Sequence, residues 1–169
     1  MIGLLHLFGD DRNLTESLVL ASAVALRLSA VAFRDALGGS ATLHPFLLRY
    51  ALAFHKQVAQ TAARDGRHYL VRRLARWLLM SHDRSSGKAF PMTHEFLSMM
   101  LGVRRAGVSV AAGAVQQAGY ICYERGVMEI SDRCGLEAVS CECYGTVRRE
   151  SERLLGAPGR PSVESGDSA

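Results

Sequence analysis

The sequence has no apolar run that could cross a bilayer, which takes about 20 consecutive apolar residues. The longest candidate, residues 18–26, is short and is followed directly by Arg27. Residues 1–8 have neither the basic flank nor the small-residue cleavage site of a secretory signal. We therefore expect no membrane partner and a location in the cytoplasm.

Cysteine is scarce and is not spaced for metal binding. The chain has four cysteines, which are Cys122, Cys134, Cys141 and Cys143. None belongs to a Cys-x-x-Cys pair or a Cys/His cluster of the kind that zinc sites prefer. A disulfide framework is not expected in a cytosolic chain of this size. We expect reduced structural thiols, with metal or redox sensing as the alternative, and no bound metal or cofactor.

Patterns of catalytic residues are also missing. His94-Glu95 begins like the zinc protease motif His-Glu-x-x-His, but Ser98 stands where the second histidine is required. The carboxylates are scattered, and no Gly-x-Ser-x-Gly nucleophile elbow occurs. We therefore assign no catalytic residue and do not expect an enzyme.

The chain does have abundant apolar residues and a basic segment. Of its 169 residues, 49% are hydrophobic, which is enough to bury a core, and the formal net charge is +4. Between Glu95 and Glu124 there is no acidic residue, while Arg104 and Arg105 stand together in that stretch. A basic segment without acids favours a polyanionic partner such as nucleic acid.

Hydrophobic periodicity predicts the elements before this basic segment. Residues 17–28, rich in Val and Leu, predict one or two strands, and residues 29–37 predict a short helix that two glycines close. Residues 68–81 predict a helix with its arginines outward, namely Arg72, Arg73 and Arg76. Residues 83–89 predict a loop by their Ser and Gly content.

Residues 43–64 predict the clearest long helix, and it carries two adjacent apolar stripes. The first follows the alternating four-and-three spacing of a coiled-coil seam and comprises Leu47, Ala51, Phe54, Val58 and Thr61. The second stripe comprises Leu48, Leu52, His55, Ala59 and Ala62. Two stripes let one helix pack on its own domain and on a partner together. We therefore favour dimerisation through the first stripe over a helix buried within its own domain.

Residues 93–130 combine helices, a glycine turn and a hairpin in one order. The first predicted element is a helix over residues 93–101 with Thr93 as its N-cap, and a tight turn at Gly102-Val103 follows it. A second helix is predicted over residues 104–118, and Gly119 ends it. Two strands over residues 120–123 and 127–130 then form a hairpin around Glu124-Arg125-Gly126. This is the order of a winged helix-turn-helix.

In a helix-turn-helix, the second helix enters the major groove with its N-terminal turn toward the base edges. The predicted DNA contacts on that turn are Arg104, Arg105, Ala106, Gly107 and Ser109. An arginine can bond two guanine acceptors, the small Ala106 and Gly107 allow a close approach, and Ser109 can bond phosphate. Thr93 at the start of the first helix and Arg125 at the hairpin tip complete the predicted set.

Ordered runs extend this pattern on both sides of the motif. They are Arg73-Leu74-Ala75-Arg76-Trp77-Leu78-Leu79, Thr93-His94-Glu95-Phe96-Leu97, Met100-Leu101-Gly102-Val103-Arg104-Arg105, Gly119-Tyr120-Ile121, Asp132-Arg133-Cys134-Gly135-Leu136-Glu137 and Cys141-Glu142-Cys143-Tyr144. With them, residues 47–144 resemble the C-terminal half of the Crp/Fnr superfamily of bacterial transcription regulators. The resemblance implies a homodimer on a two-fold symmetric operator, with residues 43–64 as the dimer helix and Arg105 as the principal base-reading arginine. RNA polymerase is a further candidate partner.

Departures from the family narrow what the resemblance implies. Ala106 stands where many relatives carry a carboxylate that accepts from cytosine, so we expect a different operator. Residues 1–37 resemble only the last strands and the following short helix of the family's N-terminal β-roll, and they contain no Gly-Glu…Arg-Ala phosphate-binding run. We therefore expect no bound cyclic nucleotide. The N-terminal four-cysteine pattern of iron–sulfur members is also missing.

The sequence therefore predicts a mainly α fold with a small β content (α+β). Its expected parts are a β-roll remnant over residues 1–40, a dimerisation helix over residues 41–66, a winged helix-turn-helix domain over residues 67–150 and a disordered tail over residues 156–169. The predicted function is that of a sequence-specific, DNA-binding transcription regulator. The alternative is a protein-interaction module, a truncated regulator that dimerises with full-length relatives and blocks them without productive DNA binding.

Overall fold

The computed structural model describes residues 1–13, 16–17, 19, 24–64, 69–85, 87–140 and 142–156. Its elements, in chain order, are η1 (Leu4–Phe8), α1 (Ala30–Gly39), α2 (Leu43–Arg64), α3 (Leu70–His82), β1 (Ala89–Pro91), α4 (His94–Leu101), α5 (Arg105–Gln117), β2 (Ile121–Glu124), β3 (Val127–Ile130), α6 (Arg133–Val139) and α7 (Glu142–Leu155). The predicted mainly α fold with a small β content is confirmed. Among the described residues, no helix has both the length and the apolar character that crossing a membrane needs.

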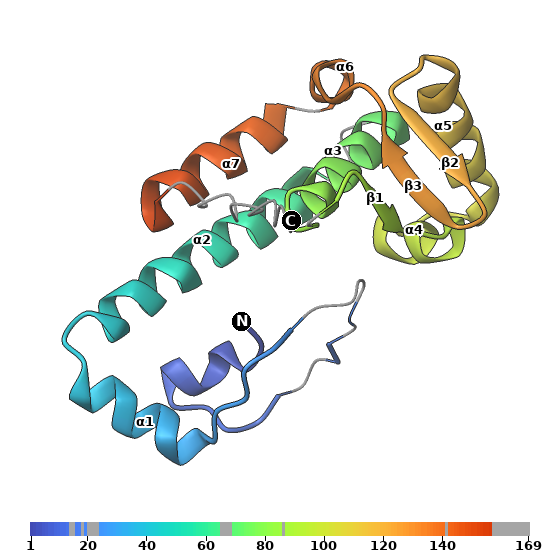
Figure 1. The fold of residues 1–169 in the computed structure, drawn as a ribbon. Coiled ribbons are helices and arrows are strands. Elements are labelled where there is room, and N and C mark those ends of the chain that lie inside the picture. The colour runs from blue at the N-terminus through green and yellow to red at the C-terminus, as the bar shows by residue number, and fades with distance from the viewer. Residues whose placement is uncertain are drawn as a thin grey trace, which may run out of the picture.

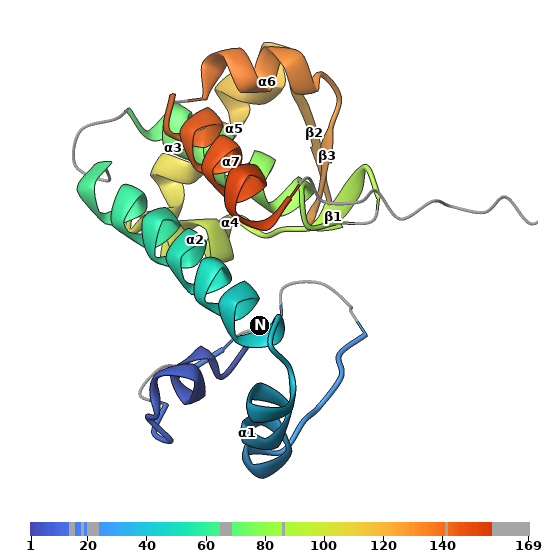
Figure 2. The same cartoon turned by 90° about the vertical axis from the view of Figure 1, so that its left-hand side faces the viewer.

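The long helix α2 joins two parts of the molecule (Figure 1). At its N-terminal end lies the N-terminal part, residues 1–42, with η1 and α1. At its other end α3 to α6 and the sheet pack together, and α7 runs back antiparallel beside α2 (Figure 1). Residues 69–156 are called the C-terminal unit below. Figure 2 shows α1 at the opposite end of the molecule from α6 and the sheet.

The core lies in the C-terminal unit, where α3, α4, α5, α6 and the sheet meet. Its fully buried side chains include Leu74, Leu78, Leu79, Leu97, Val108, Val115, Met128 and Leu136. Full burial of one such side chain is worth about 1.5–3 kcal/mol relative to exposure. These contacts fix which faces of α4 and α5 point inward, and therefore which faces stay in solvent.

The sheet is a three-stranded antiparallel arrangement in the order β1-β3-β2. The hairpin of β2 and β3 is confirmed, with Glu124 paired to Val127 across a two-residue turn. Both turn residues have a positive φ, 50° at Arg125 and 82° at Gly126, as a tight hairpin of this length requires. The edge strand β1 was not predicted, because it has three residues and ends in Pro91, which an edge position tolerates.

The N-terminal part departs from its prediction. The described residues among positions 17–28 form no strand, and residues 18 and 20–23 lie outside the described ones. The predicted helix is confirmed as α1, where the Ser29 hydroxyl accepts from the Ala32 amide at 3.2 Å, but the helix continues through both closing glycines. A β-roll remnant is therefore not seen as strands in the residues that the structure describes.

The predicted long helix is confirmed residue for residue as α2, and its first stripe is divided. Leu47 and Ala51 are buried, whereas Phe54 and Val58 are 49% and 48% exposed. Leu48 and Leu52, of the second stripe, are also exposed. The apolar surface left open on α2 thus combines Phe54 and Val58 of the first stripe with the second stripe, all of whose residues are exposed.

Two arginines of α3 were predicted to point outward and do not. Arg76 is buried, and its Nη2 donates to the Thr61 hydroxyl of α2 at 2.9 Å. Arg73 is half-buried, and its Nη2 donates to the Leu101 carbonyl of α4 at 2.6 Å. Charge alone predicted solvent exposure for both, but a long guanidinium side chain can lie along a packed surface and bond a polar atom there. Arg72 is exposed, as predicted.

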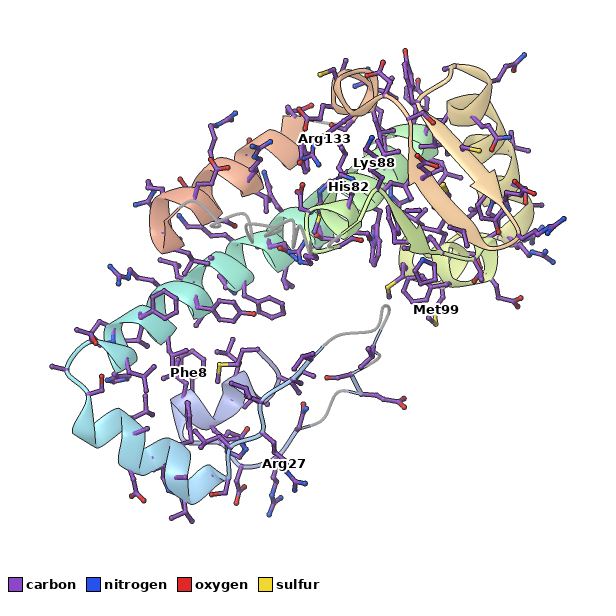
Figure 3. The ribbon with its side chains drawn as sticks, viewed as in Figure 1. Phe8, Arg27, His82, Lys88, Met99 and Arg133 are labelled. Carbon is purple, nitrogen blue, oxygen red and sulfur yellow. The ribbon has the colours of Figure 1, made fainter. Side chains whose placement is uncertain are left out.

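The last two helices were not predicted, and a charged network holds them. Arg133 of α6 donates to Glu137 at 2.8 Å, to Asp83 at 2.7 Å and to Nδ1 of His82 at 2.8 Å, and the Tyr144 hydroxyl donates to Asp83 at 2.9 Å. Figure 3 shows Arg133 and His82 beside each other at the junction of α6 with α3. The helix α7 packs on α2, where Lys56 bonds Glu150 at 2.6 Å.

Two of the predicted limits can be set beside the C-terminal elements. The limit at residue 150 falls inside α7, which continues to Leu155. The predicted disordered tail, except for Gly156, lies outside the described residues.

Candidate nucleic-acid interface

The helix α4 begins and ends on the two residues that the sequence singles out. The Thr93 hydroxyl accepts from the Phe96 amide at 3.1 Å, which confirms Thr93 as the N-cap. At the other end Gly102 has φ 62°, and the Gly102 and Val103 amides bond the Met99 and Ser98 carbonyls. These two hydrogen bonds close the helix tightly and turn the chain sharply toward α5.

The helix α5 has one buried face and one open face. Its inward residues are the predicted ones, Val108, Ala111, Ala112 and Val115. Gly107 lies against α3, since a Cβ built there would be 3.3 Å from Leu70. Gly107 therefore permits close packing of two helices, whereas the prediction gave it a role in close approach to DNA.

The other predicted contact residues of α5 lie on its open face. Arg104 is the N-cap residue, and its side chain makes no capping bond. Arg104, Arg105, Ala106 and Ser109 are all exposed. The two guanidinium groups therefore stand at the N-terminal end of α5, where the helix dipole and the first amides also favour an anion.

The hairpin tip lies next to the start of α4. Arg125 extends into solvent with its side chain 91% exposed, and the nearest charge is Glu124 at 3.7 Å. The Met92 amide donates to the Gly126 carbonyl at 2.8 Å, and a Cβ at Gly126 would be 3.8 Å from Thr93. Thr93 and Arg125, which are 32 positions apart in the numbering (125 − 93), therefore share one edge of the molecule.

His94, which was not among the predicted contact residues, connects these parts. The His94 ring stacks on Tyr123 of β2 with centroids 4.3 Å apart, and its Nδ1 is 3.0 Å from the Ser109 hydroxyl of α5. Its Nε2 is buried and has no hydrogen-bond partner within the described part of the chain. Burial, and then the nearby charge of Arg105, lower the pKa of His94 below its usual value.

His94 thus positions Ser109, α4 and the hairpin relative to one another. No local sequence signal marks this role, because the stacking partner Tyr123 and the bonded Ser109 belong to other elements. A second link of this kind joins α5 to β2, where the Tyr123 amide donates to Gln116 Oε1 at 2.9 Å. These contacts fix the hairpin against the helix that carries the arginines.

The charges of this surface suit a polyanion. Arg104, Arg105 and Arg125 are exposed there, and the acids nearest in sequence, Glu95 and Glu124, flank it. Among the residues that the structure describes, no cluster of His, Cys, Asp or Glu could hold a metal ion. The guanidinium groups, the hydroxyl and the helix amides of this surface are groups that can bind phosphates and base edges.

The chain segment that carries this surface matches one known family. Residues 72–139 match the model of the Crp-like helix-turn-helix domain. This segment is a Crp-like helix-turn-helix domain. The Crp-like domain extends from α3 to the end of α6, so it includes α4, α5 and the hairpin. It is the domain of DNA-binding transcription regulators, which confirms the family resemblance of the sequence over these residues. No curated protein shows significant similarity to the chain.

Proposed function

We propose that the chain is a homodimeric transcription regulator that binds a two-fold symmetric operator with α5 in the major groove. The observation that carries the proposal is the position of Arg105. It is exposed on the first turn of a helix whose opposite face is buried, and the Crp-like domain supplies that helix. A regulator of this kind acts on chromosomal DNA in the cytoplasm, with RNA polymerase as a further candidate partner.

Each exposed residue of the surface has a proposed contact. Arg105 bonds the two acceptors of a guanine, which contributes about 1–3 kcal/mol of base discrimination. Arg104, Ser109 and Thr93 bond phosphates of one groove wall, and Arg125 bonds a flanking phosphate. When His94 Nδ1 donates to the Ser109 hydroxyl, the hydroxyl proton stays available to a phosphate oxygen.

The homodimer is supported by the apolar surface left open on α2. Phe54, Val58, Leu48 and Leu52 are exposed there, although leaving such side chains in solvent forgoes the free energy of burial. A two-fold axis beside α2 would bring the same surface of two chains together. A two-fold symmetric operator presents half-sites about 34 Å apart, one turn of the double helix, so the two α5 helices of the dimer would need that separation.

The base-reading role of Arg105 is tested on operators selected from a random pool of duplex DNA. We expect Arg105→Ala to lose affinity for the selected operator by about 1–3 kcal/mol per half-site and to relax preference at one base pair. The matched control is Arg27→Ala, which removes the same charge from an exposed site in the N-terminal part (Figure 3).

Affinity is measured by fluorescence anisotropy over a series of salt concentrations. A DNA binder loses affinity steeply as salt rises, because phosphate contacts release counterions. Equal losses on operator and random DNA for Arg105→Ala would refute base reading. No DNA affinity at any salt concentration would instead support the protein-interaction alternative.

The dimer is tested separately by sedimentation equilibrium. Phe54→Glu should give a monomer with a native circular dichroism spectrum and much weaker operator binding, because a charge on a buried interface is costly. Val31→Glu, at an exposed apolar site on α1, should remain a dimer. A dimeric Phe54→Glu variant would show that α2 is not the interface.

A further inference from the structure

Beyond its arginine, the open face of α5 is uncharged and almost without polar side chains in its first two turns. At about 100° per residue, Arg105 and Val110 lie at the two edges of this face, with Ala106, Ser109 and Gly113 between them. Val110 is 75% exposed, although it stands on a helix whose other face is packed in the core. No described residue covers Gly113, since a Cβ built there meets no atom within 4 Å.

Val110 also borders a shallow apolar groove between α3 and α5. Its lining residues are Tyr69, Leu70, Val71, Ala106, Gly107, Val110, Ala111 and Ala114. The two sequence neighbours of Val110 contact other parts of the chain, because Ala111 is buried in the core and the Ser109 hydroxyl bonds His94. Val110 therefore adds nothing to the core and is directed to whatever α5 meets.

We propose that Val110, supported by Ala106, recognises the C5-methyl group of a thymine in the same half-site in which Arg105 recognises guanine. The inference rests on the proposed function, and it names a determinant of operator sequence. The methyl group of thymine is the one apolar group on the major-groove edges of the four bases. An exposed valine on a groove-facing helix is its natural counterpart.

The spacing fits two separate base contacts. Val110 follows Arg105 by five residues, which is about 7.5 Å along the helix axis, or about two base-pair steps of 3.4 Å. The two side chains therefore address different base pairs. A guanine or cytosine opposite Val110 would place the polar groups of the base against the methyl groups of the valine. An unpaired polar group in an interface weakens binding.

Continuity with the cationic surface favours DNA over a protein as the occupant. Ala106 belongs both to the apolar groove and to the first turn that carries Arg105. A protein seated on Val110 would also cover Ala106 and would keep α5 out of the major groove. A DNA half-site, by contrast, can place a thymine against Val110 and a guanine against Arg105 in one docking geometry.

Replacing thymine by deoxyuridine tests this contact, because the change removes the methyl group and keeps base pairing. The full chain is used with its selected operator, and each thymine of a half-site is replaced in turn. We expect one position at which the wild type loses affinity about fourfold, the value for about one methylene-sized group returned to water. In Val110→Ala, the same replacement should leave affinity unchanged.

Two control variants make the result specific. Val31→Ala makes the same change at a 60% exposed position on α1 and should keep the fourfold response. Arg105→Ala should bind more weakly overall and still respond to the methyl group, because the two contacts are on different base pairs. Circular dichroism is expected to be native for both, since neither side chain is in the core.

The outcomes separate this inference from the proposed function. It is overturned if the wild type responds to no methyl group, or if Val110→Ala responds as the wild type does. It is also overturned if Val110→Ala changes the oligomeric state with an unaltered methyl response, since the groove then binds protein. Arg105-dependent operator binding without a methyl response would leave the proposed function standing. A chain that binds no duplex would contradict both.

Discussion

The N-terminal part and the C-terminal unit differ in how much apolar surface they bury. No described residue among positions 1–42 is buried, and both η1 and α1 lack a buried side chain. In the C-terminal unit, one continuous core joins five helices, α3 to α7, and the sheet. An apolar run fixes a structure only where another element covers it, which is the reason that similar runs in the two regions have different outcomes.

The largest expected effect of this difference is on core leucines. Leu97 of α4 is fully buried, whereas Leu26 is 99% exposed. We expect Leu97→Ala to lower the free energy of unfolding by about 2–5 kcal/mol, because it removes packed methyl groups and leaves a cavity. Leu26→Ala should change it by less than about 0.5 kcal/mol. Urea unfolding followed by circular dichroism measures both.

Equal destabilisation of the two variants would contradict this difference in apolar burial between the two regions. That result would mean that the N-terminal part packs its leucines in solution, for example against a second chain. Repeating the Leu26→Ala measurement over a range of protein concentrations would identify such a contact, because the stability of a dimer depends on concentration.

The same contrast explains how much the sequence could predict. The limits of α2 and the faces of α5 follow from apolar spacing, because each apolar residue of α5 that the pattern turned inward has a partner in the core. The hairpin follows from local turn chemistry at Arg125-Gly126. The strands expected over residues 17–28 had the composition of strands, but the residues of this range that the structure describes (17, 19 and 24–28) form no strand and none of them is buried.

What the sequence could not predict depends on contacts between distant elements. Arg76 is buried because Thr61 of a preceding helix offers it an oxygen, and His94 is at the candidate interface because it stacks on Tyr123. Neither contact leaves a periodic pattern. The exposed arginines at the start of α5 were predictable because the pattern of their helix is local, whereas the residues that position this helix come from distant elements.

A smaller effect is expected from two matched helix caps. Thr93 caps α4 and Ser29 caps α1, each by accepting an amide hydrogen bond, at 3.1 and 3.2 Å. We expect Thr93→Ala to lower the free energy of unfolding by about 1 kcal/mol, because α4 is part of the core unit. Ser29→Ala should leave global unfolding unchanged and only fray α1.

Differential scanning calorimetry, which reports global unfolding, measures the two caps. Equal shifts of the melting temperature would contradict a division of the molecule into a cooperative unit and a weakly packed part. Because Thr93 is also a proposed phosphate contact, operator affinity should fall in Thr93→Ala and not in Ser29→Ala.

The smallest expected effect is a dependence of stability on pH, and it belongs to the C-terminal unit. Burial, and then the charge of Arg133, lower the pKa of His82 below its usual value of 6.5, and burial followed by Arg105 does the same for His94. The unfolded chain therefore binds protons first. Stability should be complete above about pH 6.5 and should fall as the pH is lowered below it.

Two features separate this effect from other titrations. His82 Nδ1 accepts from Arg133, so protonation places two cations together, and His82→Gln should flatten the decline. The bonds from Arg153 and Lys56 lower the pKa of Glu150 to about 2, so the stability that Glu150 contributes is lost only at more acidic pH. Urea midpoints between pH 7.5 and 5 measure the histidine range alone. A midpoint that rises toward pH 5 would show that protonated His82 and His94 are better accommodated in the folded chain than in the unfolded one.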